Sequence, residues 1–131
     1  MNYKTFKKNL ESYVGLLSDR KCLQEDIDLL YYELENVKGV RYDKAPSTPN
    51  NNLVELKKLE MIEKISIKED RLAYVEQRIT KINEDISLLS EDCQKICNMN
   101  KMGVSFEKIG EELGYTKVGA YLKLKREVEK L

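Results

Sequence analysis

Residues 105–131 read SFEKIGEELGYTKVGAYLKLKREVEKL and predict two short helices around one tight turn. The first helix is expected to bury Phe106, Ile109, Gly110 and Leu113 on one face. Gly114 is expected to end this helix, because glycine adopts the left-handed conformation without steric cost. Thr116 can cap the second helix by accepting a hydrogen bond from a free N–H in its first turn. The second helix is expected to bury Ala120, Leu124, Val128 and Leu131.

This layout predicts a helix-turn-helix, whose second helix can lie in the major groove of DNA. Gly110 supports the prediction, because two helices that cross steeply leave no room for a larger side chain four residues before the turn glycine. A helix, a glycine turn and a second helix also occur in folds that bind no nucleic acid. The pattern alone therefore leaves a DNA-binding motif and an ordinary helical corner as alternatives.

The distribution of charge favours a local nucleic-acid contact over a general one. The 131 residues include 23 basic and 23 acidic side chains, so the formal net charge is zero. Nonspecific coating of nucleic acid needs clustered positive charge, which this balance argues against. The last sixteen residues are nevertheless basic, with Glu127 and Glu129 outnumbered by Lys117, Lys123, Lys125, Arg126 and Lys130.

The sequence predicts a soluble, cytoplasmic protein without a metal site. No apolar run reaches the length of a membrane span, and the N-terminal MNYKTFKKNL lacks the apolar core of a signal peptide. Three cysteines make a poor disulfide framework. Cys93 and Cys97 share a helix face, but the chain has no histidine and no other cysteine pair to complete a metal site. Both are therefore expected to be small apolar core residues, and no cofactor is expected.

Upstream of residue 89 the sequence predicts a long helical hairpin. Residues 5–38 are expected to form one helix whose apolar face is Leu10, Tyr13, Val14, Leu17, Leu23, Ile27, Leu30, Leu34 and Val37. Gly39 is placed to cap its C-terminus. A connector near residues 39–52 follows, because Pro46 and Pro49 disfavour helix.

Residues 52–88 predict a second helix of nearly equal length. Its apolar seam, interrupted only by Lys68, is Met61, Ile65, Leu72, Val75, Ile79, Ile82, Ile86 and Leu89. Matched lengths favour an antiparallel hairpin over residues 1–88, in which each helix covers the stripe of the other. Pairing of a long helix with a second copy of itself remains an alternative. Two hairpins that pair into a dimeric four-helix bundle would bury more apolar surface than one.

A third short helix is expected to complete the C-terminal domain, residues 89–131. Ser90 is a suitable N-cap, and Glu91 and Asp92 place negative charge where the helix dipole favours it. Cys93, Ile96, Cys97 and Met99 then face inward as far as Gly103. The predicted fold is therefore all-α: a long antiparallel hairpin followed by a small three-helix domain with a helix-turn-helix.

With these residues placed, the C-terminal domain resembles the DNA-reading domain that ends bacterial sigma factors. The matching positions are Phe106, Ile109, Gly110, Leu113, Gly114, Thr116, Leu124 and Leu131. Gly110 stands where that family usually has alanine and Ala120 where it has a larger branched residue, so packing beneath the second helix is expected to be thinner. The Tyr42–Asp43–Lys44 motif before a polar stretch is similar to one in ArpU-type late transcription regulators of phages.

The resemblance implies a DNA-binding transcription regulator of a phage or prophage. The positions implied to read bases are Lys117, Val118, Tyr121 and Leu122, and those near phosphates are Thr116, Lys123, Lys125 and Arg126. Lys117 and Tyr121 are expected to be exposed. Leu122 departs from the usual polar reader and suits only a thymine methyl or a protein partner. A homodimer through the hairpin is expected, because a two-fold partner doubles the phosphate contacts of one helix-turn-helix. The resemblance to sigma factors implies contact of the hairpin with RNA polymerase as the alternative.

Two other classes of function are weighed against this one. A coiled-coil interaction adaptor that does not bind DNA would use Tyr121 and Leu122 against a protein. An enzyme is not expected, because the chain has no histidine, no glycine-rich phosphate loop and no carboxylate pair in an evident pocket.

Overall fold

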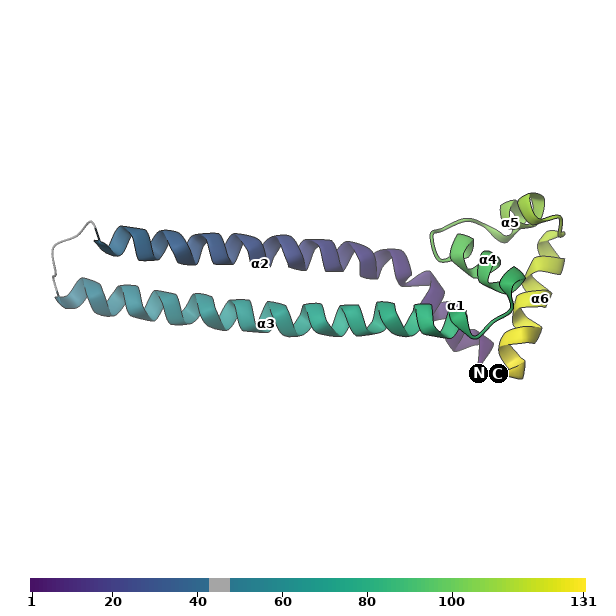
Figure 1. Cartoon of the computed structure of the whole chain (residues 1–131), viewed down its shortest axis with the longest axis horizontal. Coiled ribbons are helices and arrows are strands. Elements are labelled where there is room, and N and C mark those ends of the chain that lie inside the picture. Colours follow the sequence, from purple (N-terminus) through teal and green to yellow (C-terminus); the bar gives the residue numbers. More distant parts are fainter. Residues whose placement is uncertain (43–47) are drawn as a thin grey trace. The chain divides into compact units, whose positions relative to one another are not determined.

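The computed structural model describes the backbone of residues 1–42 and 48–131, and the side chains of residues 1–37 and 53–131. Within these ranges there is no strand, which confirms the all-α class. None of the described helices has the length and hydropathy that crossing a membrane requires. The helices are α1 (Tyr3–Glu11), α2 (Tyr13–Tyr42), α3 (Thr48–Ser87), α4 (Glu91–Asn100), α5 (Phe106–Leu113) and α6 (Lys117–Lys130) (Figure 1).

The single helix expected over residues 5–38 is wrong, because Ser12 separates α1 from α2. The Ser12 hydroxyl donates to the carbonyl oxygen of Asn9 at 2.8 Å. Such a bond from a side chain back to the preceding turn competes with helical geometry and bends helices. The apolar face also shifts at the break, since Val14 is exposed and Leu16, which was not expected to face inward, is buried.

The boundaries at the connector also differ from those expected. α2 continues through Gly39 to Tyr42, so Gly39 is not its C-cap, and α3 begins at Thr48 rather than near residue 52. Pro49 lies in the first turn of α3, where a missing N–H costs no helical hydrogen bond. Asp43, Lys44 and Pro46, by contrast, lie outside the described residues.

The chain divides into two compact units. One contains residues 1–18 together with 77–131, and the other contains residues 19–76. The first eighteen residues, which the sequence analysis assigned to the hairpin, therefore belong to the same unit as α4, α5 and α6.

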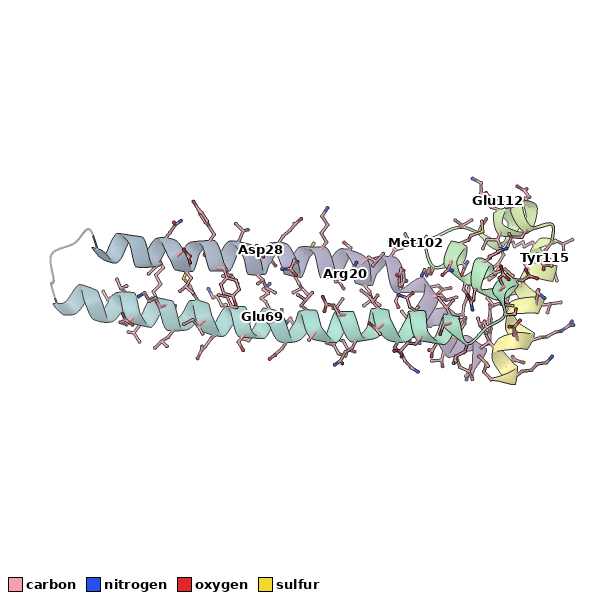
Figure 2. All side chains as sticks on the ribbon, in the orientation of Figure 1. Arg20, Asp28, Glu69, Met102, Glu112 and Tyr115 are labelled. Atoms are coloured by element: carbon pink, nitrogen blue, oxygen red, sulfur yellow. The ribbon has the colours of Figure 1, made fainter. Side chains whose placement is uncertain are left out.

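In the unit of residues 19–76, α2 and α3 lie side by side and run in opposite directions (Figure 1), as expected for a hairpin. The predicted seam faces inward: Ile27, Met61, Ile65 and Val75 are buried. Lys68, the one polar residue of the seam, places its Nζ 3.0 Å from Oδ2 of Asp26 on the opposite helix. Charged side chains along the two helices, such as those of Arg20, Asp28 and Glu69 (Figure 2), are exposed.

In the other unit, α1, α4, α5 and α6 pack around a core of fully buried side chains. Its largest members are Leu10, Cys93, Ile96, Cys97, Ile109, Leu124 and Val128. The expected inward residues Cys93, Ile96 and Cys97 of α4 and most of those of α6 are therefore confirmed. In α5, Ile109 and Gly110 are buried as expected, whereas Phe106 and Leu113 are only partly buried. Leu131 is an exception at 50% exposed, because it follows the last residue of α6. α1 contributes Tyr3, Phe6 and Leu10 and packs against α4 and α6.

The caps of this unit agree with the sequence analysis. The Ser90 side chain accepts from the N–H of Cys93 at 3.4 Å, and that of Thr116 accepts from the N–H of Gly119 at 2.9 Å. Gly114 ends α5 with φ of +82°, in the left-handed region. Ser105, which the sequence analysis did not assign, caps α5 by accepting from the N–H of Lys108 at 3.3 Å.

Gly110 is where α5 meets the backbone of the following turn. The N–H of Tyr115 donates to the carbonyl oxygen of Gly110 at 2.8 Å. A Cβ added at Gly110 would lie 2.5 Å from the carbonyl oxygen of Tyr115 and 3.1 Å from the carbonyl carbon of Thr116. These are backbone atoms, so no side-chain rotation can relieve the overlap. The expectation that only a minimal residue fits here is confirmed.

We predict that Gly110→Ala lowers the free energy of unfolding by about 1–3 kcal/mol, because the turn must move to accommodate the methyl group. The control is Gly15→Ala, in the first turn of α2, where an added Cβ meets nothing within 4 Å. That change is expected to stabilise the protein by about 0.5–1 kcal/mol. Denaturant unfolding followed by circular dichroism measures both. Equal stability of the two variants would contradict the close approach at Gly110.

Candidate nucleic-acid interface

α6 has one buried and one outward face. Ala120, Leu124 and Val128 are fully buried and hold the helix on the core. The outward face, at helical spacing, is formed by Val118, Leu122 and Arg126. Val118 is 63% exposed, which is high for an apolar side chain in a charged helix. This face is the one available to a ligand.

The DNA-binding residues implied by the resemblance differ in their solvent exposure. Thr116, Lys117, Val118 and Arg126 are exposed, whereas Tyr121, Leu122, Lys123 and Lys125 are partly buried. The Thr116 hydroxyl is engaged as the N-cap of α6. Lys117 follows in the first turn of the helix and does not cap it. It is the best placed of the predicted base readers to reach a ligand at the N-terminal end of α6.

Tyr121 is not the exposed residue that the sequence analysis expected. Its ring packs edge-to-face on Tyr3, with ring centres 5.5 Å apart, and on Phe106, with ring centres 5.9 Å apart. Edge-to-face pairs of this kind stabilise beyond the area they bury. Tyr121 therefore joins α1, α5 and α6, and its main contacts are within the protein.

α1 is the part of this region that the sequence analysis did not anticipate. Besides Tyr3, it supplies Lys7, whose Nζ lies 4.2 Å from the centre of the Phe106 ring and donates to Oδ1 of Asn100 at 3.2 Å. Tyr3, Phe6 and Leu10 recur at helical spacing, so a separate amphipathic helix could have been inferred. The sequence contains no signal for the surface on which this helix packs.

Glu127, on the side of α6 away from Tyr121, attaches this helix to α4. Glu127 accepts hydrogen bonds from the N–H of Ser90, from its hydroxyl at 2.9 Å and from the Cys93 thiol at 2.8 Å. Burial, together with the hydrogen bond to Glu127, raises the pKa of Cys93 to about 11. The thiol therefore stays protonated and serves as a donor rather than as a nucleophile.

The turn between α5 and α6 is also attached to α4. The hydroxyl of Tyr115, which Figure 2 labels beside α6, donates to Oδ2 of Asp92 at 3.3 Å. This bond and the Glu127 cluster hold both ends of α6 with respect to α4. These contacts to α4 fix the position of α6 and therefore also the position of its outward face.

Next to the outward face lies a hollow of about 450 Å³ with a basic lining. Three cations, Lys123, Arg126 and Lys130, line it beside Gly119 and Leu122, and Glu127 is its single carboxylate. Glu127 keeps its negative charge, but three cations outnumber this one carboxylate. The positive charge of this strip is thus available to an anionic ligand.

The described residues offer no sign of other chemistry in this region. No group of three or more histidine, cysteine, aspartate or glutamate side chains among them is placed to hold a metal ion. Cys93 and Cys97 are fully buried, as expected for core residues. Comparison of the chain with protein families, curated proteins and solved structures finds no match.

We predict that Glu127→Gln lowers stability by about 1 kcal/mol at neutral pH, because an amide cannot accept all three hydrogen bonds. Burial acts to raise the pKa of Glu127, but the bonds from Cys93 and Ser90 outweigh it and leave the pKa below its ordinary value of 4.5. Because the pKa of Glu127 is lowered in the folded protein, its carboxylate stabilises the fold fully at pH values above the ordinary pKa. This stabilisation is lost as the pH falls through the lowered pKa. Unfolding measured from pH 7 downward should show this acid-dependent loss in the natural protein and not in the variant. Glu129→Gln, at an exposed position, is the control, and an identical pH profile for Glu127→Gln would contradict the assignment.

Proposed function

We propose that the protein is a DNA-binding transcriptional regulator of a phage or prophage that reads duplex DNA through α6. The observation that carries the proposal is the concentration of cations around the outward face of α6 in a chain of zero net charge. The short turn between α5 and α6, with its left-handed Gly114 and its Thr116 cap, supports it further. The resemblance to sigma factors and ArpU-type regulators supplies the phage context.

In this proposal α6 enters the major groove with its N-terminal end toward the bases, as recognition helices do. Lys117 is exposed there and can donate to O6 and N7 of guanine. Val118 and Leu122 can contact thymine methyl groups, which are the apolar feature of the groove. Lys123, Arg126 and Lys130 would bind phosphates on one rim of the groove and so position the helix without reading sequence.

We also propose that the hairpin pairs with a second copy of the chain. Among the described side chains of residues 19–76, several large apolar ones are 46–65% exposed: Leu29, Tyr31, Tyr32, Leu53, Leu56, Leu59, Ile62, Ile67 and Tyr74. A partner hairpin would remove these surfaces from water. It would also double the number of phosphate contacts that one α6 can make.

One observation favours a second candidate, an adaptor that binds a protein instead of DNA. The exposed Val118 and its neighbour Leu122 give the outward face of α6 an apolar centre. A protein contact through this face would bury apolar surface and respond little to salt. A DNA contact releases counterions and weakens steeply as salt rises. Salt dependence therefore separates the two.

We predict that the natural protein binds selected fragments from phage promoter regions and loses affinity steeply between ~50 and ~200 mM salt. Lys117→Gln should cost about 1–3 kcal/mol and reduce selectivity among the fragments, whereas Arg126→Gln should weaken binding to all of them about equally. Lys57→Gln, an exposed lysine of the hairpin, is the matched control. Fluorescence anisotropy on a fragment panel measures all four proteins. No binding to any fragment at low salt would overturn the proposal and favour the adaptor.

We predict that the 15.3 kDa chain has twice this mass in solution, and that Leu59→Glu with Ile62→Glu converts it to a monomer of unchanged helicity. These two side chains are 58% and 50% exposed, so charge is tolerated there in the separate hairpin but not within an interface. Gln77→Glu with Thr80→Glu adds the same charge to exposed polar positions of α3 and serves as the control. Light scattering and circular dichroism are the measurements. A monomeric natural protein would contradict self-association and direct attention to RNA polymerase as the partner of the hairpin.

A further inference from the structure

A second basic hollow lies on the opposite flank of α6, between this helix and α1. Its volume is about 630 Å³, and its cations are Lys4, Lys7 and Lys8 of α1 with Lys125 of α6. Its two carboxylates belong to Glu11 and Glu129, and the tyrosines Tyr3 and Tyr121 also line it. Four cations against two carboxylates leave a net positive lining.

The four lysines are not equivalent. Lys7 is engaged by Phe106 and Asn100, and its Nζ lies 4.0 Å from a carboxylate oxygen of Glu11. Burial lowers the pKa of its ammonium, as expected for a cation partly removed from water. Lys7 is therefore occupied within the protein.

The other three lysines of this hollow are more open to a ligand. Lys4 and Lys8 are exposed, one helical turn apart on α1, and form no ion pair with any residue that the structure describes. Lys125 is partly buried, and its Nζ lies over the Tyr121 ring at 6.0 Å from the ring centre. A cation over an aromatic face keeps its charge and can still bind an anion from the solvent side.

The position of this hollow relative to the outward face of α6 is set by helical spacing. At 3.6 residues per turn, Tyr121 and Lys125 lie on one side of the line from Val118 to Leu122, and Lys123 and Lys130 lie on the other. The two hollows therefore border the same face from opposite flanks. A major groove is about 12 Å wide and has a phosphate backbone along each rim, so a helix in the groove meets phosphates on both flanks.

We propose that α1 is a second DNA-backbone contact, in which Lys4, Lys8 and Lys125 bind phosphodiester groups on one rim of the major groove. Lys123, Arg126 and Lys130 then bind the opposite rim. The inference rests on the proposed function and adds the N-terminal helix to the interface. The packing of Tyr3 and Phe106 on Tyr121 holds α1 in place before DNA arrives, which reduces the ordering cost of binding.

The test compares Lys4→Gln with Lys8→Gln, introduced together, and the control pair Lys57→Gln with Lys64→Gln, which removes equal charge from exposed positions of the hairpin. For each protein the slope of log Kd against log salt is measured on one bound fragment. The first pair should reduce the slope by about 2, close to one unit for each phosphate that the variant no longer neutralises. Selectivity among fragments and the thermal unfolding midpoint should stay unchanged, because both lysines are exposed and read no bases.

Each alternative result has a distinct meaning. Steep salt dependence in the natural protein with an unchanged slope in Lys4→Gln/Lys8→Gln would overturn the α1 contact and leave DNA reading by α6 intact. An equal reduction in the control pair would show that overall charge, and not α1, sets the slope, and would also overturn the inference. Absence of DNA binding by the natural protein would remove the proposed function itself and the α1 contact with it.

Discussion

The carbonyl oxygen of Tyr115 lies only 2.5 Å from the place that a Cβ of residue 110 would take, and the placement of α6 follows from this close approach. Without a side chain at Gly110, the backbone of the turn can pass directly over α5, and the N–H of Tyr115 can bond to the Gly110 carbonyl. Gly114 supplies the reversal through its positive φ, and Thr116 starts the next helix. The close approach then directs Ala120, Leu124 and Val128 into the core and leaves Val118 and Arg126 outside.

The features that were predicted well from the sequence are those governed by short stretches of chain. A cap such as Ser90 or Thr116 depends on atoms within three residues, and the seam through Met61, Ile65 and Val75 depends on a simple repeat. The interruption of that seam by Lys68 was also visible, although its ion pair with Asp26 on the other helix was not. Such local chemistry can be inferred from neighbouring residues alone.

The features that sequence reasoning missed depend on how particular side chains pack. Ser12 resembles many helical serines, and its role in ending α1 becomes evident only from its bond to the Asn9 carbonyl. Tyr121 was expected to be exposed as a base reader, but Tyr3 packs against its ring. For the candidate site, the charges on α6 were predictable, whereas the lysines of α1 join them only through this packing.

The pairing of Tyr3 with Tyr121 also constrains how the protein folds during its synthesis. α1 is synthesised before α6, and Tyr121 follows Tyr3 by more than a hundred residues. At typical elongation rates the interval is roughly ten seconds, and a contact of such sequence separation carries a large loop-closure cost. The hairpin contacts within residues 19–76 can form earlier, which shortens the effective separation between the two ends. Until α4 and α6 emerge, the apolar side chains of α1 lack the two helices against which they pack.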